Sequence, residues 1–127
     1  MRARTLALVH GLFYVTSGLW PVIHERSFEA VTGPKRDRWL VRTTGLLIGA
    51  VGVALLAASR ERVVARPSRV LGFASALALG AADVVFTLGG KISRVYLLDA
   101  VAEGALASSW ARQDALALAS MLQNGPP

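Results

Sequence analysis

Three acidic side chains lie in segments that are otherwise apolar enough to cross a membrane. The chain has eight Asp and Glu residues, and Asp83, Asp99 and Glu103 are the ones inside these segments. A charge at the centre of a bilayer costs roughly 2.5–3.5 kcal/mol on insertion scales, so such residues face a protein interior, a partner or water. Carboxyls placed in this way can bind a cation, an amine or a polar head group, or relay protons.

The spacing of the three acids predicts that they meet. Lys91 lies in a Gly-Gly-Lys turn, and Asp83 and Asp99 are each eight residues from it. At 1.5 Å per residue, both carboxyls lie roughly 12 Å along their helices from the turn. Glu103 follows Asp99 by four residues and shares its helix face, one turn deeper. We therefore expect a column of acids between two antiparallel helices.

Two further residues are expected to complete this cluster as a ligand or proton site. Arg42 lies just inside an apolar segment, on the same side as the turn, and can form a bidentate ion pair with Asp83 or Asp99. His10 enters from the opposite side, with Tyr14 extending the same polar line.

Three interpretations of the cluster remain open. In the first, Arg42 neutralises one acid, the others are protonated or hydrogen-bonded, and the set fixes helix register, since polar contacts are common between membrane helices. In the second, the acids bind a ligand or an ion, or relay protons. In the third, one acid meets a partner subunit.

The elements that must position these residues are four apolar segments. They span residues 6–23, 39–58, 70–88 and 92–110, and each approaches the roughly 20 residues that a membrane helix needs. With 54% hydrophobic and 17% charged residues, the composition favours a membrane protein over a soluble domain. We expect an all-α, four-transmembrane-helix bundle with antiparallel up-down topology, forming one domain over residues 1–127. Residues 120–127 are expected to form a frayed C-terminal tail.

Small residues mark the helix faces that can approach closely. They recur at four-residue spacing in the second and third apolar segments, as Gly45, Gly49, Gly72, Ala76 and Gly80. Such spacing allows close backbone contact between membrane helices. We interpret these faces as packing within the bundle rather than as a dimer contact.

The net charge of +6 indicates lipid head groups rather than nucleic acid. The 14 basic residues flank the apolar segments instead of forming a stripe, and they divide seven to seven between the two sides. Arg2 and Arg4 precede the first segment, and a dense arginine cluster follows the second. These two features favour an orientation with both termini inside. Because the first segment runs into Trp20-Pro21 with no small-residue cleavage site, it is interpreted as a retained helix.

Several kinds of chemistry find no support in the sequence. The chain has no cysteine, which excludes disulfides, thiol catalysis, iron–sulfur clusters and thiolate zinc sites. His24, Glu25 and Glu29 lack a fourth ligand, so no metal site is predicted. Ser108 and Ser109 have no nearby histidine, and no catalytic residue is assigned. The cofactor is unknown, and a bulky redox cofactor would need a partner chain.

Two stretches carry a resemblance to known proteins. They are Phe28-Glu29-Ala30-Val31-Thr32-Gly33-Pro34-Lys35 and Tyr96-Leu97-Leu98-Asp99-Ala100. With the four-segment pattern, they resemble small uncharacterised bacterial four-helix integral membrane proteins, and more loosely the DoxX-like proteins in architecture. The resemblance implies a bacterial inner membrane but no activity. Small multidrug exporters have an acid in the first span, and fluoride channels have an Asn and a Phe-rich helix break; this chain has neither.

The sequence thus predicts a small polytopic membrane protein that binds or carries a small ligand or protons at an intramembrane carboxylate cluster. The alternative is a non-catalytic accessory subunit of a larger membrane complex, and an enzyme is the least favoured class. The expected partner is the lipid bilayer, with a homo-oligomer or a larger membrane complex left open.

Overall fold

The computed structural model describes residues 1–125, which form five helices and no strand. The helices are α1 (Ala3–Ile23), α2 (Glu25–Thr32), α3 (Arg38–Ala58), α4 (Arg66–Leu88) and α5 (Tyr96–Asn124). The fold is therefore all-α, as the sequence predicts. Pro126 and Pro127, which belong to the expected C-terminal tail, lie outside the described residues.

Three helices are long and apolar enough to cross a membrane, rather than the four expected. These are α1, α3 and α4, and their bounds contain the predicted segments 6–23, 39–58 and 70–88. The prediction was wrong for the fourth segment, 92–110, whose helix is not among the three. Its helix, α5, begins only at Tyr96, and α5 contains four charged residues, namely Asp99, Glu103, Arg112 and Asp114.

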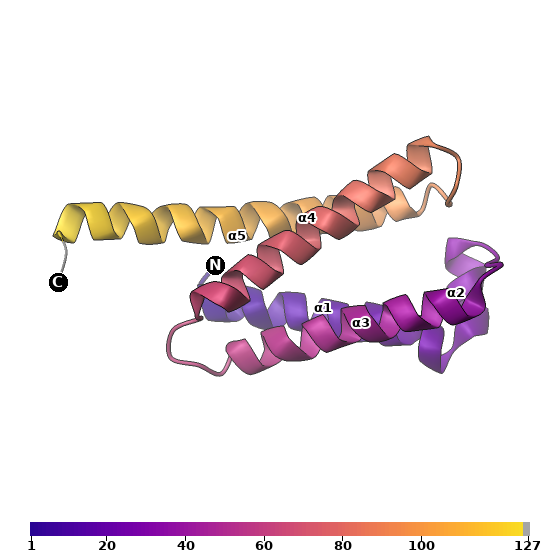
Figure 1. Ribbon diagram of the computed structural model, residues 1–127, viewed down its shortest axis with the longest axis horizontal. Coiled ribbons are helices and arrows are strands. Elements are labelled where there is room, and N and C mark those ends of the chain that lie inside the picture. The colour runs from indigo at the N-terminus through magenta and orange to yellow at the C-terminus, as the bar shows by residue number, and fades with distance from the viewer. Residues whose placement is uncertain (126–127) are drawn as a thin grey trace.

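Helix α5 extends well beyond the predicted apolar segment. It continues past Trp110 to Asn124. Its 29 residues span about 43 Å, which exceeds the roughly 30 Å hydrocarbon core of a bilayer. Its C-terminal part projects beyond the other helices (Figure 1).

The helices form two hairpins that touch each other sparingly. Helix α1 packs along α3, and α4 packs along α5, whereas α1 meets α5 and α3 meets α4 over short stretches. Helix α4 lies diagonally across α3 and diverges from it toward the end that carries α2 (Figure 1). The start of α1 and the end of α5 lie toward the opposite end of the molecule, consistent with the up-down order (Figure 1).

Glycines allow the two helices of the first hairpin to touch along their backbones. A Cβ added at Gly18 would lie 2.6 Å from the Gly45 carbonyl oxygen, and one at Gly52 would lie 2.8 Å from that of Gly11. No real side chain fits at such distances. Gly49 is buried too, but a Cβ added there would lie 3.6 Å from Leu19, which is an ordinary van der Waals contact.

The small residues of α4 face the second hairpin. Gly72 lies against the ring of Trp110, where a Cβ would come within 2.5 Å of the indole, and Ala76 is fully buried. A Cβ added at Gly80 would lie 3.1 Å from the Cβ of Glu103, closer than an ordinary van der Waals contact. Each predicted packing residue therefore faces the interior of the chain.

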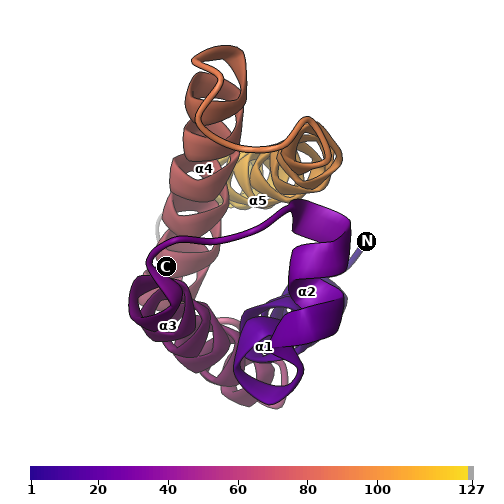
Figure 2. The ribbon, with the colours of Figure 1, turned by 90° about the vertical axis from the view of Figure 1, so that its right-hand side faces the viewer.

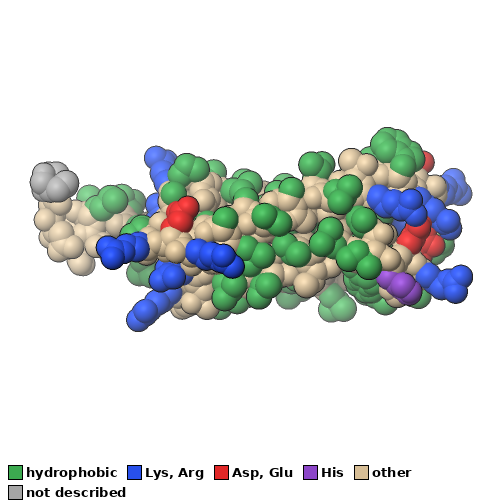
Figure 3. Space-filling model, turned by 90° about the horizontal axis from the view of Figure 1, so that it is seen from below, with side chains coloured by type: hydrophobic (Ala, Val, Ile, Leu, Met, Phe, Trp, Pro, Cys, Tyr) green, Lys and Arg blue, Asp and Glu red, His purple; other side chains and the backbone are tan. Residues whose placement is uncertain are grey.

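The apolar core sits at the end of the molecule that holds the N-terminus. It contains Leu6, Ala7, Leu55, Ala58, Val64 and Trp110. Between the ends, large apolar side chains point outward, and Leu47, Val53, Val85 and Val101 are all more than half exposed. Lysines and arginines gather at both ends with hydrophobic side chains between them (Figure 3). This is the surface pattern of helices that cross a bilayer.

Replacing Gly18 with Ala is expected to lower the melting temperature in detergent, because the added Cβ would force α1 and α3 apart. Overpacking of this kind costs roughly 1–3 kcal/mol. The matched control is Gly104→Ala, where a Cβ meets nothing within 4 Å and the better helix propensity of Ala applies. Equal melting temperatures for the two variants would contradict the close contact.

Candidate functional site

A cavity of about 610 Å³ opens between the two hairpins, toward the end that carries α2. All five helices contribute to its lining, which is mainly apolar. Figure 2 looks at this end of the molecule and shows how the five helices that line the cavity are arranged. Three acidic side chains line the cavity, and they are the three singled out in the sequence: Asp83, Asp99 and Glu103.

Glu103 is buried and held by a partner from the other hairpin. Its side chain is 1% exposed, and its Oε2 accepts a hydrogen bond of 2.8 Å from the Tyr14 hydroxyl. The bond joins α5 to α1. A phenol is a good donor to a buried carboxyl, because its ring packs as an apolar group while its hydroxyl remains available.

Asp83 and Asp99 both line the cavity, Asp83 from α4 and Asp99 from α5. Asp83 is 8% exposed, and its Oδ2 has no hydrogen-bond partner among residues 1–125. The cavity therefore contains a buried acceptor that the described chain does not satisfy.

His10 lies behind the cavity rather than in its lining. The indole Nε1 of Trp110 donates a 3.0 Å hydrogen bond to His10 Nδ1, and the imidazole meets the Tyr14 ring edge to face at 4.1 Å. Because indole N–H only donates, Nδ1 is the acceptor and the imidazole proton is on Nε2. That nitrogen is buried without a partner in the described part of the chain. His10 reaches the acids only through Tyr14.

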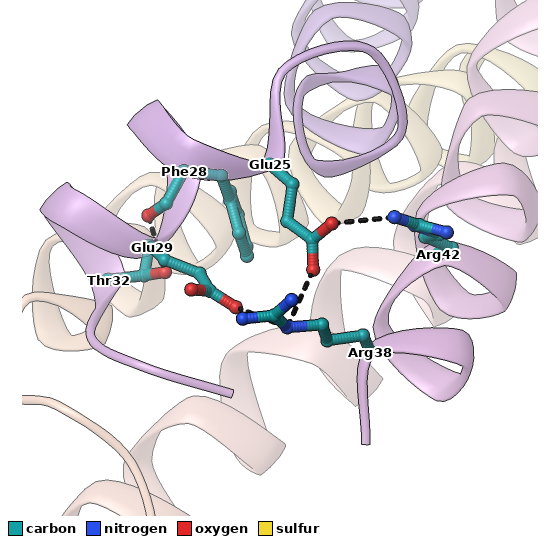
Figure 4. A network of polar contacts seen from close by, with 6 residues as sticks. All are labelled: Glu25, Phe28, Glu29, Thr32, Arg38 and Arg42. Carbon is teal, nitrogen blue, oxygen red and sulfur yellow. Dashed lines mark hydrogen bonds and ion pairs between the residues drawn. The ribbon is translucent and has the colours of Figure 1, made fainter. Parts of the chain in front are cut away.

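Arg42 does not neutralise Asp83 or Asp99. It pairs with Glu25 of α2, with 2.6 Å between Nη2 and Oε2. Arg38 lies between Glu25 and Glu29, with its Nε 3.1 and 3.4 Å from their carboxylate oxygens (Figure 4). Helix α2 folds back beside α3 and offers these acids near the surface, where an ion pair loses less hydration than inside the bundle.

Aromatic side chains fix the cavity wall beside α2. Trp20 donates to the Ser27 hydroxyl at 2.8 Å and meets the Phe28 ring edge to face at 5.4 Å. Lys35 lies over the rings of Phe28 and Tyr96, at 5.7 and 5.0 Å from their centroids. These contacts connect α1, α2 and α5 around the cavity.

The cavity has the character of a small-molecule site rather than a metal site. Its volume falls within the roughly 300–1,000 Å³ of typical ligand pockets, which are mostly apolar with a few polar groups. Over residues 1–125, no group of three His, Cys, Asp or Glu side chains is arranged to hold a metal ion. The arrangement can bind an apolar molecule and present carboxyls to a polar group on it.

The sequence interpretation missed some residues that build the site. Gly11 and Gly18 meet Gly52 and Gly45, and the two pairs share a seven-residue spacing that could have been found. Trp110, in contrast, could not be recognised as the partner of His10, since nothing in the sequence places it inside the bundle.

Comparisons with known proteins add no relative. No protein-family model, curated protein or solved structure matches this chain. The functional argument therefore depends on the residues of the cavity themselves.

Replacing Tyr14 with Phe is expected to lower the free energy of unfolding by about 1–3 kcal/mol, because Glu103 would stay buried without its donor. Tyr96→Phe is the matched control, since the Tyr96 ring rather than its hydroxyl contacts Lys35. Both variants would be unfolded in one detergent and followed by circular dichroism. A loss no larger than that of Tyr96→Phe would show that the hydrogen bond does not support the site.

Proposed function

We propose that this protein is a small integral membrane protein that binds or carries a small ligand, or protons, at its carboxyl-containing cavity. One observation carries the proposal: Asp83 Oδ2 is buried in the cavity lining without a partner among residues 1–125. An unsatisfied buried acceptor costs about 1–3 kcal/mol, and a bound donor removes that cost. The presence of three carboxyls in one cavity supports proton binding, because a carboxyl that takes up a proton becomes a hydrogen-bond donor to a neighbouring acceptor.

We further propose that α5 is the fourth membrane helix, despite its charges. It packs antiparallel along α4, which is long and apolar enough to cross a bilayer. Its acids Asp99 and Glu103 line the cavity rather than the outer surface. Buried on that side, they need not meet lipid, which is the usual arrangement of ionisable residues at membrane depth. The proposed orientation has both termini inside, in a bacterial inner membrane.

A second candidate is a non-catalytic accessory subunit of a larger membrane complex. It is supported by the projecting part of α5, where large apolar side chains are exposed, namely Leu116, Leu118, Met121 and Leu122. Exposed apolar groups on a helix that extends past its bundle favour contact with another surface.

Single cysteines test the span and orientation of α5, because the chain has none of its own. We expect a membrane-impermeant maleimide to label Ser93→Cys on intact cells, since Ser93 lies in the α4–α5 turn. Gln123→Cys, near the end of α5, should react only after permeabilisation. Labelling of both cysteines from the same side would mean that α5 does not cross the membrane.

Blocking the cavity tests ligand binding. Leu79 lines the cavity, whereas Leu77, on the same helix, is 54% exposed and outside the lining. In native mass spectrometry with 4-phenylbutanol and 4-phenylbutylamine as probes, we expect a one-to-one adduct with the unaltered chain. Leu79→Trp should reduce the adduct about tenfold or more, because the indole fills the space, whereas Leu77→Trp should not. If neither probe forms an adduct with the unaltered chain, ligand binding is refuted.

A further inference from the structure

We propose that the ligand of the cavity is an organic ammonium ion with an apolar body. The inference rests on the proposed binding function and names the class of molecule that the cavity takes. The charges, an unpartnered acceptor and the nature of the walls each point to this class.

The cavity has acidic groups without a basic counterpart in its lining, among the residues described. Three carboxyls line it, and within residues 1–125 no Lys, Arg or His side chain does. Arg42 and Arg38 are engaged by Glu25 and Glu29 of α2. Lys35 lies at the rim, where its ammonium donates to the Thr32 carbonyl oxygen at 3.0 Å. A cationic ligand would supply the charge that the lining lacks.

The acceptor geometry suits a group with several donors. Asp83 and Asp99 line the same cavity, and the Asp83 side chain is only 8% exposed. An ammonium group has up to three N–H donors and can satisfy both carboxylates, including the unpartnered Asp83 Oδ2.

The walls exclude a bare metal ion and favour an organic molecule. Ca²⁺ and Mg²⁺ require about six or more oxygen ligands, whereas this lining is mainly carbon. Several aromatic rings contribute to it, namely Phe13, Trp20, Phe28, Phe86 and Tyr96. Aromatic faces attract ammonium groups through cation–π contacts and also bury apolar surface. A volume of about 610 Å³ would be largely empty around a single ammonium, so the ligand has an apolar body.

The test compares two probes of equal shape that differ in charge. 4-Phenylbutylamine is an ammonium ion at pH 7, and 4-phenylbutanol is its neutral counterpart. By native mass spectrometry titration of the full chain, we expect the amine to bind at least about tenfold more tightly, since hydrogen bonds to charged groups are about twice as strong as neutral ones.

Matched variants locate the source of this preference. Asp83→Asn keeps the side-chain volume and removes the charge, so we expect the amine and the alcohol to bind about equally. Asp114→Asn is the control, because that carboxylate lies on the exposed part of α5 and pairs with Arg69 at 3.3 Å. Circular dichroism of each variant confirms that it is folded.

The outcomes separate this inference from the proposed function. If the alcohol binds as tightly as the amine and Leu79→Trp abolishes both, the cavity binds neutral molecules and the ammonium inference is wrong while ligand binding stands. If the Asp83→Asn variant keeps the full preference for the amine, the inference is also wrong. If neither probe binds the unaltered chain, the proposed binding function itself fails.

Discussion

The structure depends on keeping ionisable side chains inside an apolar bundle, which requires a partner for each buried polar group. Two hydrogen bonds meet part of this requirement, whereas His10 Nε2 and Asp83 Oδ2 have no partner among residues 1–125. Tyr14 donates to Glu103, and Trp110 donates to His10. Both connect α1 to α5, and the hairpins otherwise contact each other sparingly. The hydrogen bonds that satisfy these buried polar groups therefore also fix how the two hairpins sit relative to one another.

The positions of the acids could be predicted because a helix is a rod of fixed rise. Asp83 and Asp99 are equally far from the turn at Lys91, so antiparallel packing of α4 and α5 brings them to one level whatever the neighbouring helices do. The three apolar spans were predictable for a similar reason, since length and composition determine them locally. The short spacing from Asp99 to Glu103 placed both on one face.

The partner of Arg42 could not be predicted in the same way, since it depends on where a connecting segment folds. The chain between α1 and α3 forms α2. Its position is set by His24, whose Nδ1 accepts a hydrogen bond from the Ser27 N–H at the start of the helix, and by the contacts of Trp20 with Ser27 and Phe28. That position brings Glu25 to Arg42. The part of α5 beyond Trp110 is helix-forming without being apolar enough for a membrane segment, so hydropathy alone does not mark where this helix ends.

The sparse contact between the hairpins has a mechanical consequence. Within the first hairpin, glycine pairs bring the backbones of α1 and α3 into contact, and within the second Gly72 lies against the Trp110 ring. Few contacts join the two hairpins, and α4 diverges from α3 toward the end that carries α2 (Figure 1). The cavity lies between the hairpins, so a change in the angle between them would change its volume while leaving the packing within each hairpin intact.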